Sequence, residues 1–468
     1  MSWIDLSIFI VYLAAMLGVG VYFLRKNKNT DDYYVGGRKL SGFHIGLSVV
    51  ATDVGGGFSI GLGGLGFTMG LSGSWLLFTG LLGAWLSGVL LIPRISETAR
   101  LKGFLSFPQF LEFVFNKKVA LIAGLISAIG YLGFTSSQIL AGAKLASSTF
   151  QGLSLNSALL LMGGIAILYT VLGGLKAVIY TDTIQWIVLM AGLVFVGIPV
   201  SFFAIGGFDA IYNTLSPEFL SLRNISWQQI VNWMFTIIPI WFIGMTLYQR
   251  IYAAKNTRAA QQGWFIAGLF EYPLMAFMGV ILGMFARVAV ENQILPGYTA
   301  ATLDAEMGLP LLLKTVLPVG LLGIVLSAYF SAIMSTADSC LMAASGNILT
   351  DVLKMHNSPN SLRFSQFITF LIGGVALLLA LRMTSVLQLM LHSYSFMVSG
   401  MIVPVLAALF TKTPNARAAL IAMIVGGTST LVLIIGGFEL PWKLDANIFG
   451  IALSAIAYSL SNLFIRKV

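Results

Sequence analysis

The chain has 468 residues, of which 58% are hydrophobic and 9% are charged, and its mean hydropathy is +0.92. A soluble domain carries about 25% charged residues, so this composition excludes a water-soluble enzyme and a disordered chain. Cys340 is the only cysteine, which excludes a disulfide scaffold. The sequence therefore predicts an all-α protein that crosses a membrane many times.

Thirteen apolar stretches are long enough to span a bilayer as helices. The first does not resemble a cleaved signal peptide, because its basic residues follow it rather than precede it. No nucleotide-binding motif of the GxxxxGK[ST] type occurs, so uphill transport would depend on an ion gradient or a partner protein. The predicted spans cover residues 4–24, 43–71, 74–93, 118–149, 155–174, 176–206, 228–249, 259–290, 310–339, 361–383, 385–410, 415–437 and 445–465.

The basic residues in the loops predict the orientation of the chain, because cytoplasmic loops carry an excess of Lys and Arg. With an external N-terminus, 20 of the 26 Lys and Arg residues fall on the cytoplasmic side, and Arg223, Arg382 and Lys443 fall outside. The other three, Lys144, Arg287 and Lys314, lie near helix ends. We therefore expect a multi-pass plasma-membrane protein, or an inner-membrane protein in a bacterium, with a cytoplasmic C-terminus. The net charge of +9 reflects this topology and does not indicate nucleic-acid binding.

The second span contains a glycine-rich stretch that interrupts its apolar pattern. Seven of the twelve residues from 55 to 66 are glycine, and Asp53 precedes them. Glycine weakens a helix by about 1 kcal/mol per residue relative to alanine, so the span is expected to unwind here. Unwound backbone inside a membrane can coordinate a cation through its carbonyl oxygens. The alternative is close helix packing through small residues.

The ninth span carries a cluster of hydroxyl groups beside an acid, namely Ser335, Thr336, Asp338 and Ser339. Hydroxyl oxygens are hard ligands suited to sodium, although a single Ser or Thr often bonds back to its own helix. Acids inside spans are costly and mark ion or substrate pathways. We expect this cluster to converge with the other polar breaks at a similar depth. Apart from Asp5 and Asp445 at span ends, the acids within spans are Asp53, Asp182, Glu271 and Asp338.

These features occur together with motifs that resemble the sodium/solute symporter family, whose members include bacterial proline and sialic acid transporters and animal glucose and choline transporters. The resemblance covers nearly the whole chain. The matching stretches are Asp31–Arg38, the broken second span, Tyr169–Gly174, Tyr180–Gln185, the pair Gln249–Arg250, and Ala332–Thr336.

The resemblance implies the leucine-transporter fold, in which five spans repeat in inverted orientation as the next five. The first repeat would cover residues 43–206 (spans two to six) and the second residues 207–411 (spans seven to eleven). Residues 1–42, with the first span and a cytoplasmic loop, and residues 412–468, with the last two spans, would be peripheral.

The resemblance also implies where sodium binds. The principal sodium site would take backbone carbonyls of Ala51, Val54 and Ala332 and the side-chain oxygens of Ser335 and Thr336. Some members bind a second sodium ion slightly deeper. The matching positions for that second site are Asp182, Ser335, Asp338 and Ser339.

By the same resemblance, the substrate would meet the second, third, fourth and seventh spans. Phe134 stands where the sialic acid transporter has an arginine, which argues against an acidic sugar. The choline transporter's aromatic cage is mostly missing, whereas Asp53 and Phe134 are closest to the proline pattern. The matching substrate positions are Asp53, Gly55, Phe58, Phe134, Thr135, Gln138 and Trp241 to Met245, with Trp241 and Gly244 foremost.

We therefore expect a symporter that imports a small organic solute with sodium and performs no enzymatic reaction. A zwitterionic amino acid such as proline ranks first as the solute, a cationic amine such as choline second, and a neutral sugar third. Two other classes remain open: a sensor that keeps the transporter fold without transporting, and a channel. An intramembrane enzyme is disfavoured, because His44, His356 and His392 are isolated in the sequence. The oligomeric state is not predicted.

Overall fold

A computed structural model describes residues 2–26, 38–53, 55–150, 152–355 and 361–465 of the chain. Within these ranges every regular element is a helix, and the one β-type contact is an isolated bridge between Leu40 and Ala254. The predicted all-α class is therefore confirmed.

The first half of the chain contains long apolar helices joined by short amphipathic ones. Side-chain caps fix several starts: Asn116 accepts hydrogen bonds from the backbone N–H groups of Lys118 and Val119, and Ser154 accepts one from Ser157. The elements are α1 (Trp3–Lys26), α3 (Gly42–Asp53), α4 (Gly56–Met69), η1 (Gly70–Ser74), α5 (Trp75–Leu90), α6 (Ile92–Lys102), α7 (Phe107–Val114), α8 (Lys117–Thr149), α9 (Leu155–Gly192), η2 (Leu193–Gly197) and α10 (Ile198–Ala204).

The second half repeats this mixture of long and interrupted helices. Ser226, Asn256 and Ser385 cap the starts of three of them. The elements are α11 (Gly207–Thr214), η3 (Pro217–Leu220), α12 (Trp227–Ile243), α13 (Met245–Ala253), α14 (Thr257–Leu269), η4 (Phe270–Met275), α15 (Ala276–Glu291), α16 (Ala305–Val316), α17 (Leu321–Asn347), η5 (Ile348–Val352), α18 (Ser361–Ala380), α19 (Val386–Phe410), α20 (Ala416–Gly436), η6 (Pro441–Lys443) and α21 (Ala446–Ile465).

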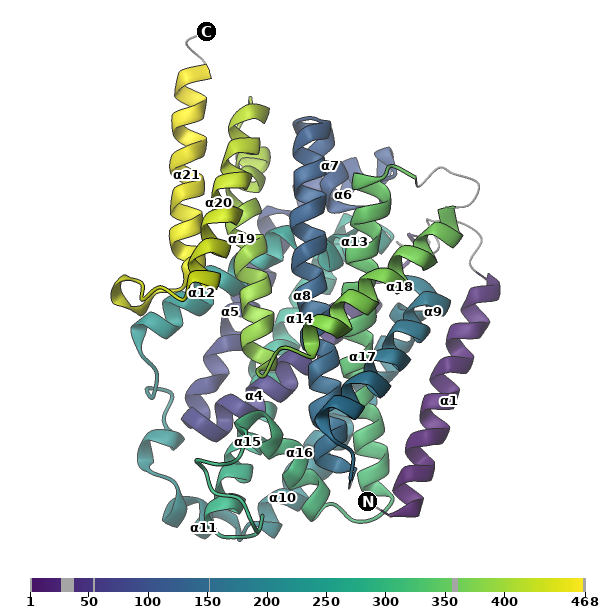
Figure 1. The fold of residues 1–468 in the computed structure, drawn as a ribbon, viewed down its shortest axis with the longest axis vertical. Helices are drawn as coiled ribbons and strands as arrows, with labels where there is room; N and C mark the ends of the chain where they lie inside the picture. Colours follow the sequence, from purple (N-terminus) through teal and green to yellow (C-terminus); the bar gives the residue numbers. More distant parts are fainter. Residues whose placement is uncertain (1, 27–37, 54, 151, 356–360, 466–468) are drawn as a thin grey trace.

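Helix α17 forms the centre of the bundle. Almost every residue from Leu322 to Asn347 is buried, and α17 packs against α8, α9 and α1. Figure 1 shows α1 at one edge of the bundle and α20 and α21 at the opposite edge, with the two termini at opposite ends of the long axis.

The predicted count of thirteen spans is not confirmed. Among the described residues, ten helical segments are long and apolar enough to cross a membrane, or eleven when the bent pair α12–α13 counts as one span. The difference has a physical origin, because an interrupted span leaves pieces that are each too short to cross alone. The apolar stretch Gly42–Thr52 of α3 is such a short piece, and α4 is counted together with α5 as Ser59–Leu90.

The predicted bounds of the ninth span are wrong at both ends. Residues 310–316 belong to the separate short helix α16, and α17 begins only at Leu321 after a turn in which Gly320 has a φ of +88°. The helix then continues to Asn347. The cluster from Ser335 to Ser339 therefore lies near the middle of α17 rather than towards its inner end.

Candidate functional site

The second span is interrupted between α3 and α4, beside the middle of α17. Gly55 caps the N-terminus of α4, and a Cβ atom added to it would lie 1.8 Å from Oγ1 of Thr336. Only glycine allows the two helices to approach this closely. The Thr336 hydroxyl in turn lies 3.2 Å from the carbonyl oxygens of both Ala51 and Ala332.

This junction gathers uncharged oxygen atoms from two helices. The carbonyl oxygens of Ala51 and Ala332 and the hydroxyl of Thr336 converge, and Ser335 is the buried neighbour of Thr336 on α17. Carbonyl and hydroxyl oxygens can replace the hydration shell of a hard monovalent cation. Ala51, Ala332, Ser335 and Thr336 therefore lie on the two helical segments that meet at this junction. Val54, the fifth expected residue of the principal site, lies outside the described residues.

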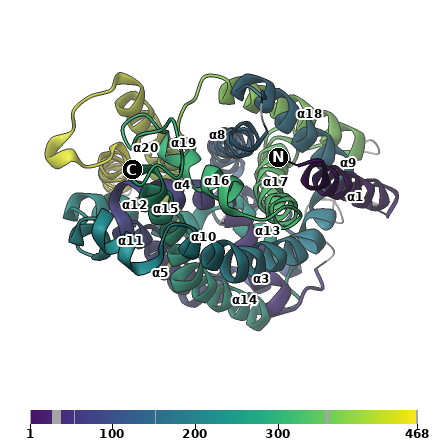
Figure 2. The same cartoon turned by 90° about the horizontal axis from the view of Figure 1, so that it is seen from below.

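Asp338 and Ser335 also line a small cavity of about 20 Å³ between α17, α9 and α1, three helices that pack against one another (Figure 2). This volume is enough for about one water molecule or ion. Asp338 accepts a short hydrogen bond from Thr170 on α9. The buried side-chain oxygen atoms of Tyr12, Ser331 and Gln185 also line this cavity.

Ser339 belongs to a separate polar cluster around Arg250. The guanidinium of Arg250 is fully buried, and its Nη2 donates to Oγ1 of Thr52 at 2.7 Å and to Oγ of Ser339 at 2.8 Å. The expected second sodium site is therefore divided. Ser335 and Asp338 share a cavity, Ser339 contacts Arg250, and the side chain of Asp182 lies outside the described part of the chain.

The seventh span is interrupted in the same manner as the second. Helices α12 and α13 are bent by 41° at Gly244, whose extended backbone separates them. The Tyr131 hydroxyl on α8 lies 3.2 Å from the backbone nitrogen of Thr246 and 3.0 Å from its Oγ1. Tyr131 thus accepts a hydrogen bond from the otherwise unpaired first turn of α13.

The expected substrate residues on α8 lie beside this second break. Phe134 is buried and packs edge-to-face against Tyr394 of α19, with ring centroids 4.9 Å apart. Gln138 is also buried, and the Thr135 hydroxyl donates to the carbonyl of Tyr131 in its own helix. The Thr135 hydroxyl is thus already engaged within its own helix.

Trp241 has a packing role in this structure. Its ring is fully buried against Trp264, and a Cβ atom on Gly83 would lie 2.3 Å from it. The side chains of Asp53 and Phe58 lie outside the described residues. Of the expected substrate residues, Gly244 lies against Tyr131 of α8, whereas Gly55 lies against Thr336 of α17.

Most of the glycines after the break pack against other helices. Gly61 faces Leu387 of α19, Gly63 faces Leu309 of α16, and Gly66 approaches the backbone of Val280. The sequence left two interpretations of this glycine-rich stretch open, an unwound helix and close helix packing. Gly55 lies at the interruption of the helix, and the later glycines allow close packing.

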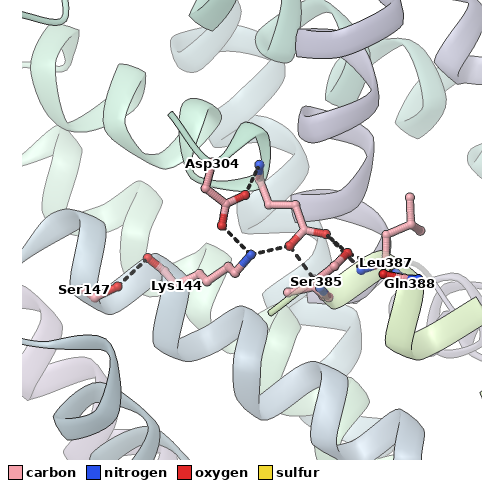
Figure 3. A network of polar contacts seen from close by, with 8 residues as sticks. Lys144, Ser147, Asp304, Ser385, Leu387 and Gln388 are labelled. Atoms are coloured by element: carbon pink, nitrogen blue, oxygen red, sulfur yellow. Dashed lines mark hydrogen bonds and ion pairs between the residues drawn. The ribbon is translucent and has the colours of Figure 1, made fainter. Parts of the chain in front are cut away.

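Sequence reasoning missed the contacts of Arg250 and Tyr131, and the ion pairs that Lys144 of α8 forms with Asp304 and Glu306 (Figure 3). Arg250 was counted among the cytoplasmic loop residues, but it is fully buried between α3, α13 and α17. The sequence signal for Arg250 was its position directly after an apolar stretch. A charged side chain buried there needs polar partners, because it is costly to bury without them.

Comparisons with known proteins agree with this architecture. The sequence model of the sodium:solute symporter family matches residues 33–426. The sodium/glucose cotransporter of Vibrio parahaemolyticus is 27% identical, over 99% of this chain and 91% of its own. The sodium/proline symporter of Escherichia coli is 28% identical, over 91% of this chain and 86% of its own.

A solved structure of a Na+-coupled sialic acid symporter, described as substrate-bound and outward-open, has a TM-score of 0.80 to this chain. It is 23% identical and covers 98% of each chain. This likeness shows the fold, which is the leucine-transporter fold expected from the sequence.

Proposed function

Because the chain belongs to the sodium:solute symporter family, we propose that it imports a small zwitterionic amino acid, of which proline is the first candidate, together with sodium. That it is a sodium-coupled symporter of small solutes, and a multi-pass membrane protein, follows from the family. The substrate and the residues that bind it are our proposal.

One observation carries the proposed ion site: the Thr336 hydroxyl lies 3.2 Å from the carbonyls of both Ala51 and Ala332 at the helix break. Sodium bound by these groups, with Ser335 and the carbonyl of Val54, would join the broken span to α17 and favour the outward-open state. Binding of the solute would then close the external side. Coupling arises because each ligand binds the two states with different affinity.

The membrane potential adds a driving force to this cycle. One sodium ion that moves inward across 100 mV gains about 2.3 kcal/mol. Loss of sodium to the cytoplasm would loosen the contact between the break and α17, so that the solute is released on the same side.

We place a second cation site at the cavity beside Asp338. The support is the set of oxygen atoms that line it, from Ser331, Ser335, Gln185, Tyr12 and Asp338 itself. Asp182 and Ser339 remain members of the proposed set by resemblance only. The variant Asp338→Asn should lower the charge that is moved across the membrane per solute molecule. An unchanged ratio of charge to solute would contradict the proposed second cation site.

The amino-acid substrate is supported by two positions. Asp53 ends α3 at the break, where a carboxylate would attract an amine, and Phe134 is a buried aromatic residue of the expected site. A cationic amine such as choline is the second candidate. A neutral sugar is the third candidate, because one of the relatives is a sodium/glucose cotransporter.

The family arrangement also supports a division into two repeats, which we propose as residues 43–206 and 207–411, flanked by peripheral residues 1–42 and 412–468. The two interrupted spans support it, because α3–α4 and α12–α13 occupy the first position of each proposed repeat.

A thermal-shift screen of the purified protein tests the proposed function. Amino acids, amines and sugars are each added in sodium chloride and in potassium chloride of equal ionic strength. We expect proline or a related amino acid to stabilise the protein in sodium only. If only a sugar or only an amine stabilises the protein, that compound replaces the amino acid as the proposed substrate. If no solute stabilises the protein in a sodium-dependent manner, the result favours a sensor over a transporter.

A further inference from the structure

Helix α1 turns one face towards the bundle. Along its sequence Asp5, Phe9, Tyr12 and Met16 follow one another at the spacing that places residues on one side of an α-helix. On another side of the helix, Val11 is 68% exposed, as suits contact with lipid. Figures 1 and 2 both show α1 beside α9 at the edge of the bundle. The residues on the inner face can therefore contribute to a site between α1, α9 and α17.

The start of α1 is fixed to the start of α17. Asp5 is buried, and its Oδ1 accepts hydrogen bonds from the backbone N–H groups of Gly320 at 2.7 Å and Gly323 at 2.9 Å. These groups need partners from outside, because the first N–H groups of a helix have none within it. A Cβ atom on Gly323 would lie 2.8 Å from Cα of Asp5, so the two backbones are in direct contact. This contact sets the position of α1 along α17.

One turn further along α1, aromatic packing continues the contact. The ring of Phe9 lies 5.5 Å from that of Phe330 on α17 and 5.4 Å from that of Phe150 at the end of α8, measured between centroids. Phe330 also lines the small cavity beside Asp338. The two helices are therefore held together immediately next to this cavity.

Tyr12 brings a hydroxyl group from α1 to the cavity. The residue lines the cavity, and its buried hydroxyl lies beside the side chains of Ser331 on α17 and Gln185 on α9. The amide nitrogen of Gln185 in turn donates to the sulfur of Met16 at 3.2 Å. Helix α1 thus contacts both neighbouring helices at the cavity through polar atoms.

The atoms around the cavity suit a small cation. Asp338, which accepts a hydrogen bond from Thr170, supplies a carboxylate, and none of the described residues that line the cavity is basic. A buried carboxylate is stabilised by a positive charge, and hard cations take oxygen ligands. The neutral oxygen atoms that line the cavity come from three helices, namely from Tyr12 of α1, Tyr169 and Gln185 of α9, and Ser331 and Ser335 of α17.

We propose that Tyr12 contributes its hydroxyl oxygen to the second cation site, so that α1 forms one wall of this site. The inference rests on the proposed second cation site beside Asp338. An ion held there contacts α1 as well as α9 and α17, and its binding ties the first helix of the chain to the two helices that carry the acid and its partner. The ring of a phenylalanine would fill the same space but would supply no oxygen.

The experiment is a sodium titration of the thermal stability of purified full-length protein, with ionic strength held constant by potassium chloride. In Tyr12→Phe, which removes the oxygen and keeps the ring, the half-maximal sodium concentration should rise by about three- to ten-fold, as for the loss of one polar contact. Tyr22→Phe is the matched control, because Tyr22 lies on the same helix, is 53% exposed and does not line the cavity. Its titration should coincide with that of the wild type.

A double-mutant cycle shows whether Tyr12 and Asp338 act on the same ion. The combined variant of Tyr12→Phe and Asp338→Asn should raise the half-maximal sodium concentration by less than the product of the two single fold-changes, because two ligands of one site are coupled. A fold-change equal to the product would mean that the two residues act independently, and this would overturn the role of Tyr12.

A spectroscopic measurement separates contact with the ion from a purely structural role. The ultraviolet difference spectrum between sodium and potassium should contain a tyrosine band in the wild type, because the surroundings of a phenol change when its oxygen binds an ion. This band should be lost in Tyr12→Phe and kept in Tyr22→Phe. A band that persists unchanged in Tyr12→Phe would overturn the contact, even if that variant were less stable.

The outcomes distinguish Tyr12 from the site to which it is assigned. If Asp338→Asn raises the half-maximal sodium concentration while Tyr12→Phe coincides with the wild type, the role of Tyr12 is overturned and the second cation site stands. An equal rise in Tyr22→Phe would also overturn it, because the effect would not depend on the cavity. If Asp338→Asn changes neither the titration nor the charge moved per solute molecule, the second cation site fails and Tyr12 with it, whereas the principal sodium site is unaffected.

Discussion

Thr336 is the residue on which the proposed ion site depends most. Its hydroxyl lies at equal distance from two carbonyl oxygens on different helices, Ala51 on α3 and Ala332 on α17. A hydroxyl oxygen keeps lone pairs while it donates its proton, so it can also bind a cation. The same atom therefore takes part in the contact between helices and in the proposed sodium shell.

We expect Thr336→Ala to raise the sodium concentration required for half-maximal solute uptake by at least about ten-fold, equivalent to roughly 1.4 kcal/mol of lost binding energy. Ser335→Ala should act in the same direction. Ser327→Ala is the matched control on the same helix, because its hydroxyl bonds back to Gly323. Uptake in vesicles at varied sodium checks this, and unchanged sodium dependence in both site variants would remove the assignment.

Gly55 gives a second prediction at the scale of one residue. A methyl group at this position would lie 1.8 Å from the Thr336 hydroxyl, so Gly55→Ala must force the helix break away from α17. We expect loss of the sodium-dependent thermal shift. Gly164→Ala on α9 is the control, because nothing lies within 4 Å of its added methyl group. A normal sodium response in Gly55→Ala would show that the close contact is not required.

Single residues were predictable from the sequence where a local pattern marked them. Three successive glycines after an aspartate indicated the break, and adjacent hydroxyls indicated Ser335 and Thr336. The partners of Arg250 could not be predicted in this way, because Thr52 and Ser339 are distant from it in the sequence. The proposed binding roles of all these residues remain predictions.

At the scale of elements, two interrupted helices define the centre of the molecule. The break in α3–α4 is stabilised by α17, and the break in α12–α13 by Tyr131 of α8. An interrupted helix exposes backbone groups that lipid cannot satisfy, so each break must be buried against another helix. These helices therefore form one connected unit.

The hydroxyl of Tyr131 gives a prediction for the second break. Tyr131→Phe removes the acceptor for the buried backbone N–H of Thr246, and an unsatisfied buried donor costs about 1–3 kcal/mol. We expect a lower unfolding temperature. In a double-mutant cycle with Thr246→Val, the two effects should be less than additive, because the hydroxyls contact each other. Full additivity would show that this contact contributes nothing.

Element types were easier to predict than element boundaries. Long apolar stretches indicated helices, and this is confirmed throughout the described residues. The start of the ninth span was placed too early, because α16 and α17 are both apolar and only a short turn separates them. Pro318 and Gly320 were the available signals of that turn, since proline and a glycine of positive φ favour a helix boundary.

At the scale of the whole molecule, the family, the leucine-transporter fold and sodium coupling could be predicted from the sequence and are confirmed. The predicted count of thirteen spans is not confirmed, because hydropathy alone does not show where a helix is interrupted. The substrate was not predictable to one compound. Relatives of nearly equal identity transport glucose and proline by name, so a few side chains in a shared fold determine the choice.

The orientation of the chain is a prediction at this scale. We expect the C-terminus in the cytoplasm and the N-terminus outside, because Lys and Arg are concentrated in the loops on one side. A fluorescent protein that folds only in the cytoplasm, fused after residue 468, should be bright. A phosphatase that is active only outside should be inactive there. The reverse pattern would invert the proposed topology.

The most direct test of the account is an experimental density map of the protein in sodium, compared with a map in potassium. We predict a peak in the sodium map, about 2.3–2.6 Å from the carbonyl oxygens of Ala51 and Ala332 and from the hydroxyls of Ser335 and Thr336, as oxygen ligands hold cations of this size. The peak should be absent in potassium. A sodium map with no peak between the helix break and α17 would contradict the account.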